Sequence, residues 1–203
     1  MRSYNEKNIK AYDKKAKNYD NSLDGKFTEK FKELLVANMV INDNYSILDV
    51  GCGNGNLLSK ISRQNKINGF GTDISPKMIE NAKARYPEFD FVVSNCEKIP
   101  FDDYSMDVIT VCAAYHHFPN VSAFASEAKR LLKPSGSLYI AEVHLPAVLR
   151  LIANFFLPLS RDGDVKFYSF NEIANTFCNV EFSLVNMIKK RHMQVIQFQG
   201  KQA

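Results

Sequence analysis

The sequence predicts one α/β domain with a doubly wound, mostly parallel sheet of about seven strands, helices on both faces and a C-terminal antiparallel hairpin. Three observations support this prediction. Short apolar runs alternate with helical segments over residues 46–143, three glycines follow the first run, and two strand-like segments lie near the C-terminal end. Alternation of apolar strands with helices is typical of a parallel sheet that helices cover on both sides.

Length and composition agree with a single domain. The chain has 203 residues, of which 45% are apolar, and this is enough for one hydrophobic core. We therefore expect residues 1–203 to form one unit. The sequence contains no long uncharged apolar run, and its first ten residues, MRSYNEKNIK, lack the apolar core of a signal peptide. We expect a cytoplasmic protein without stable membrane insertion.

The cysteines and the charges exclude several classes of function. The four cysteines form no C-x-x-C pair and lie in or beside apolar runs, so we expect buried reduced thiols, no disulfide and no metal site. The net charge of +4 is due to the basic residues that follow Glu181, the last acid. Three of them, at 189–191, are adjacent and are typical of a solvated hairpin turn. We expect no nucleic-acid partner.

The helices and strands follow from periodicity and from capping residues. Residues 1–42 contain apolar positions at helical spacing and predict two N-terminal helices. Ser75 followed by Pro76 marks a helix start, and Pro87 ends that helix. The KPSG segment predicts a turn before the fifth strand. We expect strands at 46–50, 67–73, 89–94, 106–114 and 137–143, and helices at 54–64, 75–86 and 119–132.

The pattern changes after residue 143. Residues 145–159 are strongly apolar with a single Arg150, and they predict a buried helix, a dimer contact or part of a lid insertion over 144–168. A helix should begin after Ser169, because Glu172 occupies the capping-box position. Two strand-like segments, near 180–186 and 192–199, predict the closing hairpin. A homodimer is left open.

The strongest local signal is the segment ILDVGCGNGNL, in which a strand leads directly into Gly51, Gly53 and Gly55 before a helix begins. Such a turn requires backbone angles that side chains disfavour, and a ligand lying against the amides leaves no room for a Cβ atom. The N-terminus of the following helix favours an anionic group. Cys52 lies within the same loop.

Two acids accompany the glycine loop. Asp73 ends the second strand, where its carboxylate can accept hydrogen bonds from a ribose diol. A turn or helix-capping aspartate is the alternative interpretation. Asp49 lies in an apolar strand end, so we expect it to be hydrogen-bonded to loop amides or to an ammonium group of the ligand. Together the loop and Asp73 indicate an adenosine-type ligand.

The pattern D-x-G-C-G-x-G resembles motif I of class I S-adenosylmethionine-dependent methyltransferases of the small-molecule type (methyltransferase domain 11-like), and the resemblance extends over nearly the whole chain. It differs from the dinucleotide pattern G-x-G-x-x-G/A because Asn56 stands at the last position. The resemblance implies a Rossmann-like fold and S-adenosyl-L-methionine as the cofactor. The segment GTDISPKMIE is similar to the second motif of the family and implies that Ile74 and Met78 flank the adenine.

Further segments extend the resemblance. SNCEKIPF resembles the third motif and implies that Asn95, where the family usually has an aspartate, bonds the adenine amino group beside Cys96 and Glu97. AAYHHFPN resembles the fourth strand and its turn, which places Ala113 beside the methionine part of the cofactor. AYDKKAKNYD is similar to an N-terminal segment of small-molecule members and implies that Tyr19 closes over the sulfonium, a cation that an aromatic face stabilises.

A proton acceptor is required only if the methyl acceptor is protonated at neutral pH. His116 and His117 are the candidates, because they follow the fourth strand at the ligand-binding edge of the sheet. Capping of the turn or bonding to backbone is the alternative role for both. Glu142 and His144, at the next strand end, are weaker candidates.

The expected acceptor is a small molecule, either an apolar or aromatic metabolite or an amine. The family's members that act on amino groups of nucleic acid or protein usually carry N/D-P-P-Y/F after the fourth strand, and this chain has Ala-Tyr-His-His at 114–117. Two alternatives stay open at this point. One is an NAD(P)-dependent oxidoreductase, and the other is a cofactor-binding protein of the same fold without turnover.

Overall fold

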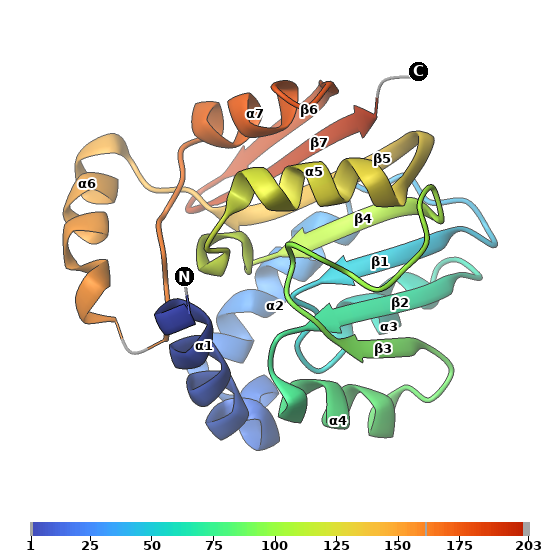
Figure 1. Cartoon of the computed structure of the whole chain (residues 1–203), viewed down its shortest axis with the longest axis horizontal. Helices are drawn as coiled ribbons and strands as arrows, with labels where there is room; N and C mark the ends of the chain where they lie inside the picture. Colours follow the sequence, from blue (N-terminus) through green and yellow to red (C-terminus); the bar gives the residue numbers. More distant parts are fainter. Residues whose placement is uncertain (1, 161, 201–203) are drawn as a thin grey trace.

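The computed structural model describes residues 2–160 and 162–200. The strands are β1 Ser46–Val50, β2 Asn68–Asp73, β3 Asp90–Val93, β4 Met106–Cys112, β5 Leu132–Val143, β6 Phe182–Lys190 and β7 Met193–Gly200. In the part of the chain so described they form one sheet in the order β3-β2-β1-β4-β5-β7-β6 (Figure 1). The strands β1 to β5 pair in parallel, and β7 is antiparallel to both β5 and β6. The predicted sheet and its C-terminal hairpin are confirmed.

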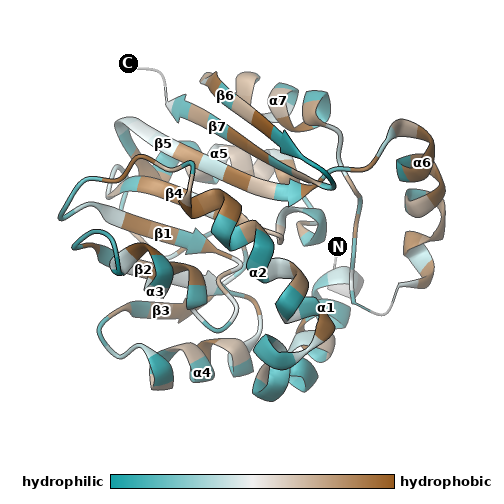
Figure 2. Cartoon of the chain, turned by 180° about the vertical axis from the view of Figure 1, so that it is seen from behind, coloured by the Kyte–Doolittle hydropathy of each residue, from teal (hydrophilic) through white to brown (hydrophobic). Residues whose placement is uncertain are grey.

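Helices cover both faces of the sheet, as predicted. They are α1 Arg2–Lys15, α2 Leu23–Val36, α3 Asn56–Ser62, α4 Pro76–Arg85, α5 Val121–Leu131, α6 Ala147–Phe156 and α7 Phe170–Cys178. On one face lie α5 and α7, and on the other lie α2 and α3 (Figures 1 and 2). Fully buried side chains fill both layers, among them Phe124 and Phe177 on the first face and Leu35 and Leu57 on the second. Burial of one such side chain stabilises the fold by about 1.5–3 kcal/mol.

The predicted helix starts are confirmed by their capping contacts. The Ser75 hydroxyl accepts a hydrogen bond from the Met78 amide at 3.2 Å, with Pro76 in the first helical position. At α7 the Ser169 hydroxyl and the Glu172 carboxylate each accept from the other's backbone amide, which completes a capping box. These contacts satisfy amides that a helix leaves unpaired at its N-terminus.

The KPSG turn at 133–136 is different from the prediction. These residues lie inside β5, which begins at Leu132 instead of 137. The pairing with β4 shifts register between Met106 and Val108, and Ser135 has a φ of 64°. Leu132 pairs with Met106 and the next pair is Ser137 with Val108, so residues 133–136 bulge out of the ladder between these two pairs. The segment therefore keeps a turn-like conformation within the bounds of β5.

The segment after β5 stands apart from the sheet (Figure 1). No residue of α6 is buried, and Leu151 and Phe155 are 69% and 78% exposed. The expectation of a buried helix is therefore wrong, because nothing in the described part of the chain covers the apolar side of α6. Within residues 2–160 and 162–200, none of the helices combines the length and the apolar character that crossing a bilayer requires.

The cysteines are free thiols, and they differ in exposure. Cys52 and Cys96 are buried, Cys112 is half-buried and Cys178 is exposed at the end of α7. The expectation of buried thiols is wrong for Cys178, since α7 turns that residue away from the sheet. Its sequence context of apolar residues did not distinguish the two sides of an amphipathic helix.

Candidate active site

The site lies where the order of the sheet reverses, between β1 and β4. In doubly wound sheets the connections on the two sides of such a point leave the sheet in opposite directions and open a crevice at the carboxyl ends of the strands. The first connection is the glycine loop after β1, and the second is the turn after β4 that contains the 3-10 helix η2 Tyr115–His117. Asp73 ends the neighbouring β2.

The glycine loop has the backbone conformation that the sequence predicts. Gly51, Gly53 and Gly55 have φ values of 75°, 53° and 80°. A Cβ atom on Gly51 would lie 2.6 Å from the Cβ atom of Ala114, whereas one on Gly53 would meet no protein atom within 4 Å. Gly53 also lines the cleft. Its bare backbone therefore forms a cradle in which a ligand can approach the main chain.

Asp73 connects the loop to the end of β2. Its carboxylate accepts hydrogen bonds from the Gly53 amide and the Ser75 amide, both at 2.9 Å. The bond from the Ser75 amide is the contact expected of a turn aspartate, which was the alternative interpretation. Asp73 also lines the cleft, as a ligand-binding residue would. A carboxylate has about four acceptor positions, so two remain for a ligand. Burial raises the pKa of Asp73, although its bonds from Ser75 and Gly53 act in the opposite direction.

Asp49 is buried, but its partner is not the one expected. The Thr110 hydroxyl on β4 donates to Asp49 Oδ1 at 2.8 Å, while the loop amides of Gly51 and Cys52 donate to the carbonyl of Thr72 instead. Burial raises the pKa of Asp49 to about 7, with the Thr110 bond and the charge of Lys32 acting the other way. A cation placed beside this carboxylate would stabilise its charged form.

The cleft contains about 880 Å³ of space that protein atoms do not occupy, and part of this space is open to solvent. It contains most of the residues that the sequence analysis assigned to the cofactor. Those that line it are Tyr19, Gly51, Cys52, Gly53, Asp73, Ile74, Met78, Asn95 and Cys96.

Four other assigned residues lie outside the lining in the described structure: Asp49, Gly55, Glu97 and Ala113. Gly55 faces the packing side, because a Cβ atom there would lie 2.7 Å from the Phe91 ring. Ala113 donates its amide to the carbonyl of Ala141, and its neighbour Ala114 lines the cleft. The roles of these four residues stay predictions.

Asn95 already uses the oxygen that was expected to face the adenine. Asn95 Oδ1 accepts from the backbone amides of Glu97 and Lys98 at 3.1 and 2.9 Å. The carboxamide thereby closes the turn after β3, and its NH₂ group is what it can offer to a ligand. Its assignment to the adenine also stays a prediction.

Several lining residues were missed by the sequence analysis. Lys32 is the most notable, because it is a lysine with 9% exposure that lines the cleft. Thr28, one helical turn earlier on α2, lines the cleft as well. The signal available in the sequence was a lysine one position after Phe31, inside the apolar stripe of an amphipathic helix. Asn5 and Asn8 line the cleft from α1.

The N-terminal helix is attached to the site by polar contacts. Asp13 accepts hydrogen bonds from the Ser75 hydroxyl at 2.6 Å and from the Lys77 amide at 3.2 Å. These contacts hold α1 against the start of α4. Tyr12 and Tyr19 both line the cleft, with their ring centroids 5.9 Å apart. Burial, the largest effect, raises the pKa of Tyr19 to about 12.

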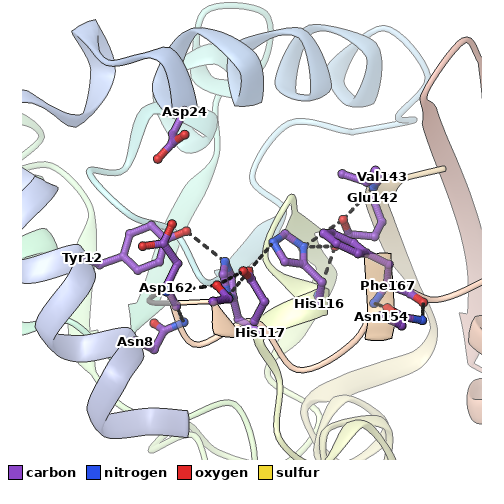
Figure 3. A network of polar contacts seen from close by, with 12 residues as sticks. Asn8, Tyr12, Asp24, His116, His117, Glu142, Val143, Asn154, Asp162 and Phe167 are labelled. Carbon is purple, nitrogen blue, oxygen red and sulfur yellow. Dashed lines mark hydrogen bonds and ion pairs between the residues drawn. The ribbon is translucent and has the colours of Figure 1, made fainter. Parts of the chain in front are cut away.

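The two predicted histidines form a network with acids from distant segments (Figure 3). His116 Nδ1 lies 2.9 and 3.0 Å from the two carboxylate oxygens of Glu142. His117 Nε2 lies 2.9 Å from the Tyr12 hydroxyl. Asp164 approaches both rings, at 3.6 Å from His116 Nε2 and 3.2 Å from His117 Nδ1. Only His117 of the pair lines the cleft.

The two histidines have opposite electrostatic environments. Burial lowers the pKa of His116, but the charge and hydrogen bond of Glu142, together with Asp164, outweigh burial, and the net pKa is raised. For His117, burial and the charge of His116 lower the pKa well below its usual range, although the Gly163 carbonyl acts in the opposite direction. His117 is therefore neutral at neutral pH, whereas the acids beside His116 favour the charged form of its ring. Of the weaker candidates, Glu142 holds His116, whereas His144 does not line the cleft.

Comparison with known proteins agrees with this geometry. Residues 48–140 match the family model of a methyltransferase domain. The chain is 31% identical over 145 residues to the ubiquinone/menaquinone biosynthesis C-methyltransferase UbiE of Rickettsia prowazekii, covering 66% of this chain and 54% of that protein. It is 35% identical over 100 residues to the demethylmenaquinone methyltransferase of Chlorobaculum tepidum, covering 49% and 41% respectively. The chain thus spans about half the length of these relatives or less.

A solved structure shares the fold over most of the chain. The methyltransferase component of a Haloferax volcanii complex with the activator Trm112, described as a putative methyltransferase, superposes with a TM-score of 0.81 at 18% identity. The match covers 94% of this chain and 97% of that one.

Proposed function

Because residues 48–140 match a methyltransferase domain and the cleft has the glycine loop and ribose-binding acid expected of the class I S-adenosylmethionine-dependent methyltransferases, we propose that the chain belongs to that class and transfers a methyl group from S-adenosyl-L-methionine to a small-molecule acceptor. One observation carries this proposal. The glycine loop and Asp73 line the same cleft as the Tyr12–His117 pair, so a nucleoside site and a proton-accepting pair share one enclosure. Displacement at a methyl group requires mainly alignment and exclusion of water, which such a cleft supplies.

The residues present fit the cofactor at its nucleoside end. Asp73 would hold the ribose with its free acceptor positions, and the open backbone at Gly53 leaves room for the ligand to approach. Ile74 and Met78 would flank the adenine. When bound, the cofactor supplies a methyl group activated by a sulfonium centre. Tyr19 lines the same cleft and would place an aromatic face near that cation, an interaction worth about 0.5–2 kcal/mol.

One charged residue on the cleft wall fits the amino-acid end of the cofactor. Lys32 is a buried lysine that lines the cleft, and its ammonium group, which lies 3.8 Å from the Glu29 carboxylate, would also pair with the carboxylate of the ligand. Asp49 lies behind the lining, so its expected contact with the ammonium group of the ligand stays a prediction.

We place the acceptor at the opposite end of the cleft, beside Tyr12 and His117. Both relatives named above are quinone methyltransferases by name, which favours the reduced, hydroxylated form of such a ring, a demethylated quinol, as the acceptor. Removal of a hydroxyl proton would make such a ring nucleophilic. His117 is neutral at pH 7 and can take that proton, directly or through the Tyr12 hydroxyl. His116 is hydrogen-bonded to Glu142 and lies next to His117, so it would act as a positioning residue.

The domain arrangement of the proposal follows the contacts of the outer segments. Residues 1–42 would cover the cofactor and acceptor, since α1 and α2 contribute Tyr12 and Lys32 to the cleft. Residues 144–168 would act as a lid, because Lys15 on α1 bonds Asp162 at 2.7 Å. We propose residues 1–203 as one unit located in the cytoplasm, without a nucleic-acid partner. A homodimer through the exposed side of α6 is compatible with this arrangement.

The test is a transfer assay with methyl-labelled cofactor and a panel of acceptors. We expect label in a demethylated quinol and none in RNA or protein from a mixed lysate. His117→Gln should reduce the rate by about 10²- to 10⁴-fold, as expected for loss of a general base, while cofactor affinity stays unchanged. Label confined to macromolecules would overturn the proposed acceptor class.

The same purified protein distinguishes the two alternative functions. An oxidoreductase would bind NAD(P), yet Asn56 begins α3 where the dinucleotide pattern requires glycine or alanine. Calorimetry with S-adenosylhomocysteine and with NAD separates these classes. Tight binding of S-adenosylhomocysteine with no methylated product across the acceptor panel would favour a cofactor-binding protein without turnover.

A further inference from the structure

The turn after β4 and the loop before α7 bring three metal-ligand atoms together. His116, His117 and Asp164 each offer one ligand atom, and these atoms lie within 4.8 Å of one another. Asp164 Oδ1 is 3.6 Å from His116 Nε2 and 3.2 Å from His117 Nδ1. Ligands at about 2.1 Å from a tetrahedral ion are about 3.4 Å apart. The two separations from Asp164 lie on either side of that value, and the two histidine nitrogens lie within 4.8 Å of each other.

These three groups do not satisfy one another by hydrogen bonding. His117 Nδ1 is buried and makes no hydrogen bond of good geometry among the described residues, although it lies 3.2 Å from Asp164 Oδ1 and the Gly163 carbonyl acts on the ring. The separation of 3.6 Å between His116 Nε2 and Asp164 is longer than a hydrogen bond. A buried imidazole nitrogen without a partner is costly, and a cation at the centre of the three groups would satisfy it.

Each of the three groups is also oriented from behind by another side chain. Glu142 accepts from Nδ1 of His116 and leaves Nε2 directed toward Asp164. The Tyr12 hydroxyl bonds Nε2 of His117 and leaves Nδ1 on the side of Asp164 (Figure 3). The Ser160 hydroxyl donates to Oδ2 of Asp164 and leaves Oδ1 facing the rings. Metal-binding histidines characteristically have such outer partners, which set the tautomer and the ring orientation.

We propose that His116, His117 and Asp164 form a binding site for a divalent d-block cation of the Zn²⁺ class. Two imidazoles and one carboxylate favour such an ion over Mg²⁺ or Ca²⁺, which prefer sets of oxygen ligands. The site joins segments that are distant in sequence. An ion here would link the loop before α7 to the turn after β4. These two segments are already joined by hydrogen bonds, because the amides of Val165 and Lys166 donate to the carbonyl of His116 at 2.8 and 3.2 Å.

The ion would compete with the proton-accepting role of His117. With a metal on Nδ1, the ring proton must lie on Nε2, where it donates to Tyr12, so His117 cannot accept a proton there. Bound Zn²⁺ should therefore inhibit transfer to an acceptor that must lose a proton. This consequence rests on the proposed function, whereas ion binding itself can be measured without turnover.

The test measures Zn²⁺ binding by equilibrium dialysis with metal analysis and by calorimetry, on an untagged protein of residues 1–203. The parent protein for all measurements carries Cys178→Ser, because the exposed thiol of Cys178 could bind zinc by itself. Every further variant is made in this parent. We expect one tightly bound Zn²⁺ per chain, no tight binding of Mg²⁺, and a rise in Tm of about 5–10 °C at a hundredfold excess over Kd.

Variants locate the ion. Asp164→Asn should weaken Zn²⁺ binding by at least about 100-fold, and Glu142→Gln, which alters only an outer partner, by about 10- to 100-fold. Asp162→Asn is the matched control, since Asp162 lies in the same loop but pairs with Lys15; its affinity for Zn²⁺ should equal that of the parent.

Two results would overturn the proposal. One is a parent protein that retains no stoichiometric Zn²⁺ in dialysis. The other is an Asp164→Asn variant that is folded by circular dichroism and binds Zn²⁺ as tightly as the parent. Either result would leave the proposed methyl transfer untouched.

Discussion

The carboxylate of Asp73 offers the sharpest test of the cofactor site. It accepts two backbone amides, from Gly53 and Ser75, both at 2.9 Å, and it lines the cleft. Asp73→Asn keeps the shape and one acceptor oxygen but removes the charge. Because burial raises the pKa of Asp73, a neutral amide avoids a desolvation cost, and the variant should fold.

The magnitude follows from the hydrogen bonds that the ligand loses. A hydrogen bond to a charged group contributes about 1.5–3 kcal/mol, and about 1.4 kcal/mol is a factor of ten in affinity. Loss of one charged contact to the ribose should therefore weaken S-adenosylhomocysteine binding by about 10- to 100-fold. Calorimetric titration of the wild-type and variant proteins measures this change directly.

Asp13→Asn is the matched control for this prediction. Asp13 also accepts a hydrogen bond from Ser75, through its hydroxyl, yet it does not line the cleft among the described residues. Its replacement should change the affinity for S-adenosylhomocysteine by less than about threefold, corresponding to a few tenths of a kcal/mol. Equal affinities of the wild-type, Asp73→Asn and Asp13→Asn proteins would refute the assignment of Asp73 to the ribose.

Three further predictions concern stability. Gly51→Ala should lower the free energy of unfolding by more than about 1–2 kcal/mol, since φ is 75° and the new Cβ would lie 2.6 Å from that of Ala114; an unchanged urea midpoint would contradict this. Although burial raises the pKa of Glu172, its bonds to Lys166 and Ser169 hold the net pKa at about 2, so the stabilisation is present above the unfolded pKa of about 4.3 and is lost as pH falls toward 2. The difference in the free energy of unfolding between the wild type and Glu172→Gln should shrink over that pH range. A difference that stays constant would contradict the assignment. Finally, Leu151→Gln with Phe155→Gln should change the free energy of unfolding by less than about 0.5 kcal/mol per site, because these side chains are 69% and 78% exposed; a large loss of Tm would show that α6 is covered in solution.

The fold could be predicted from sequence because its signals are local. The glycine loop requires positive φ at Gly51, Gly53 and Gly55, and no distant contact is needed to recognise that requirement. Strand and helix periodicities, the Ser75 cap and the Ser169 capping box are local in the same sense. Most of the cofactor residues assigned by resemblance lie in the cleft for this reason, since they follow strand ends that a parallel sheet gathers at one edge.

The chemistry of individual side chains depended on partners far away in the chain. Asp49 bonds Thr110 on another strand instead of the loop amides, and Lys32 comes to the cleft from a helix that precedes the sheet. The pKa values of His116 and His117 are shifted in opposite directions, upward by Glu142 and downward by burial, and the sequence pair His-His reveals neither cause.

The sequence by itself therefore determined the order of the elements, the conformation of the loop and the edge of the sheet at which ligands bind. Only the tertiary structure decided that α6 is exposed, that Tyr12 contacts His117, and that Asp164 meets both histidines. The physical reason is that backbone preferences act within a few residues, whereas burial, pKa shifts and ligand sets are properties of the space between segments.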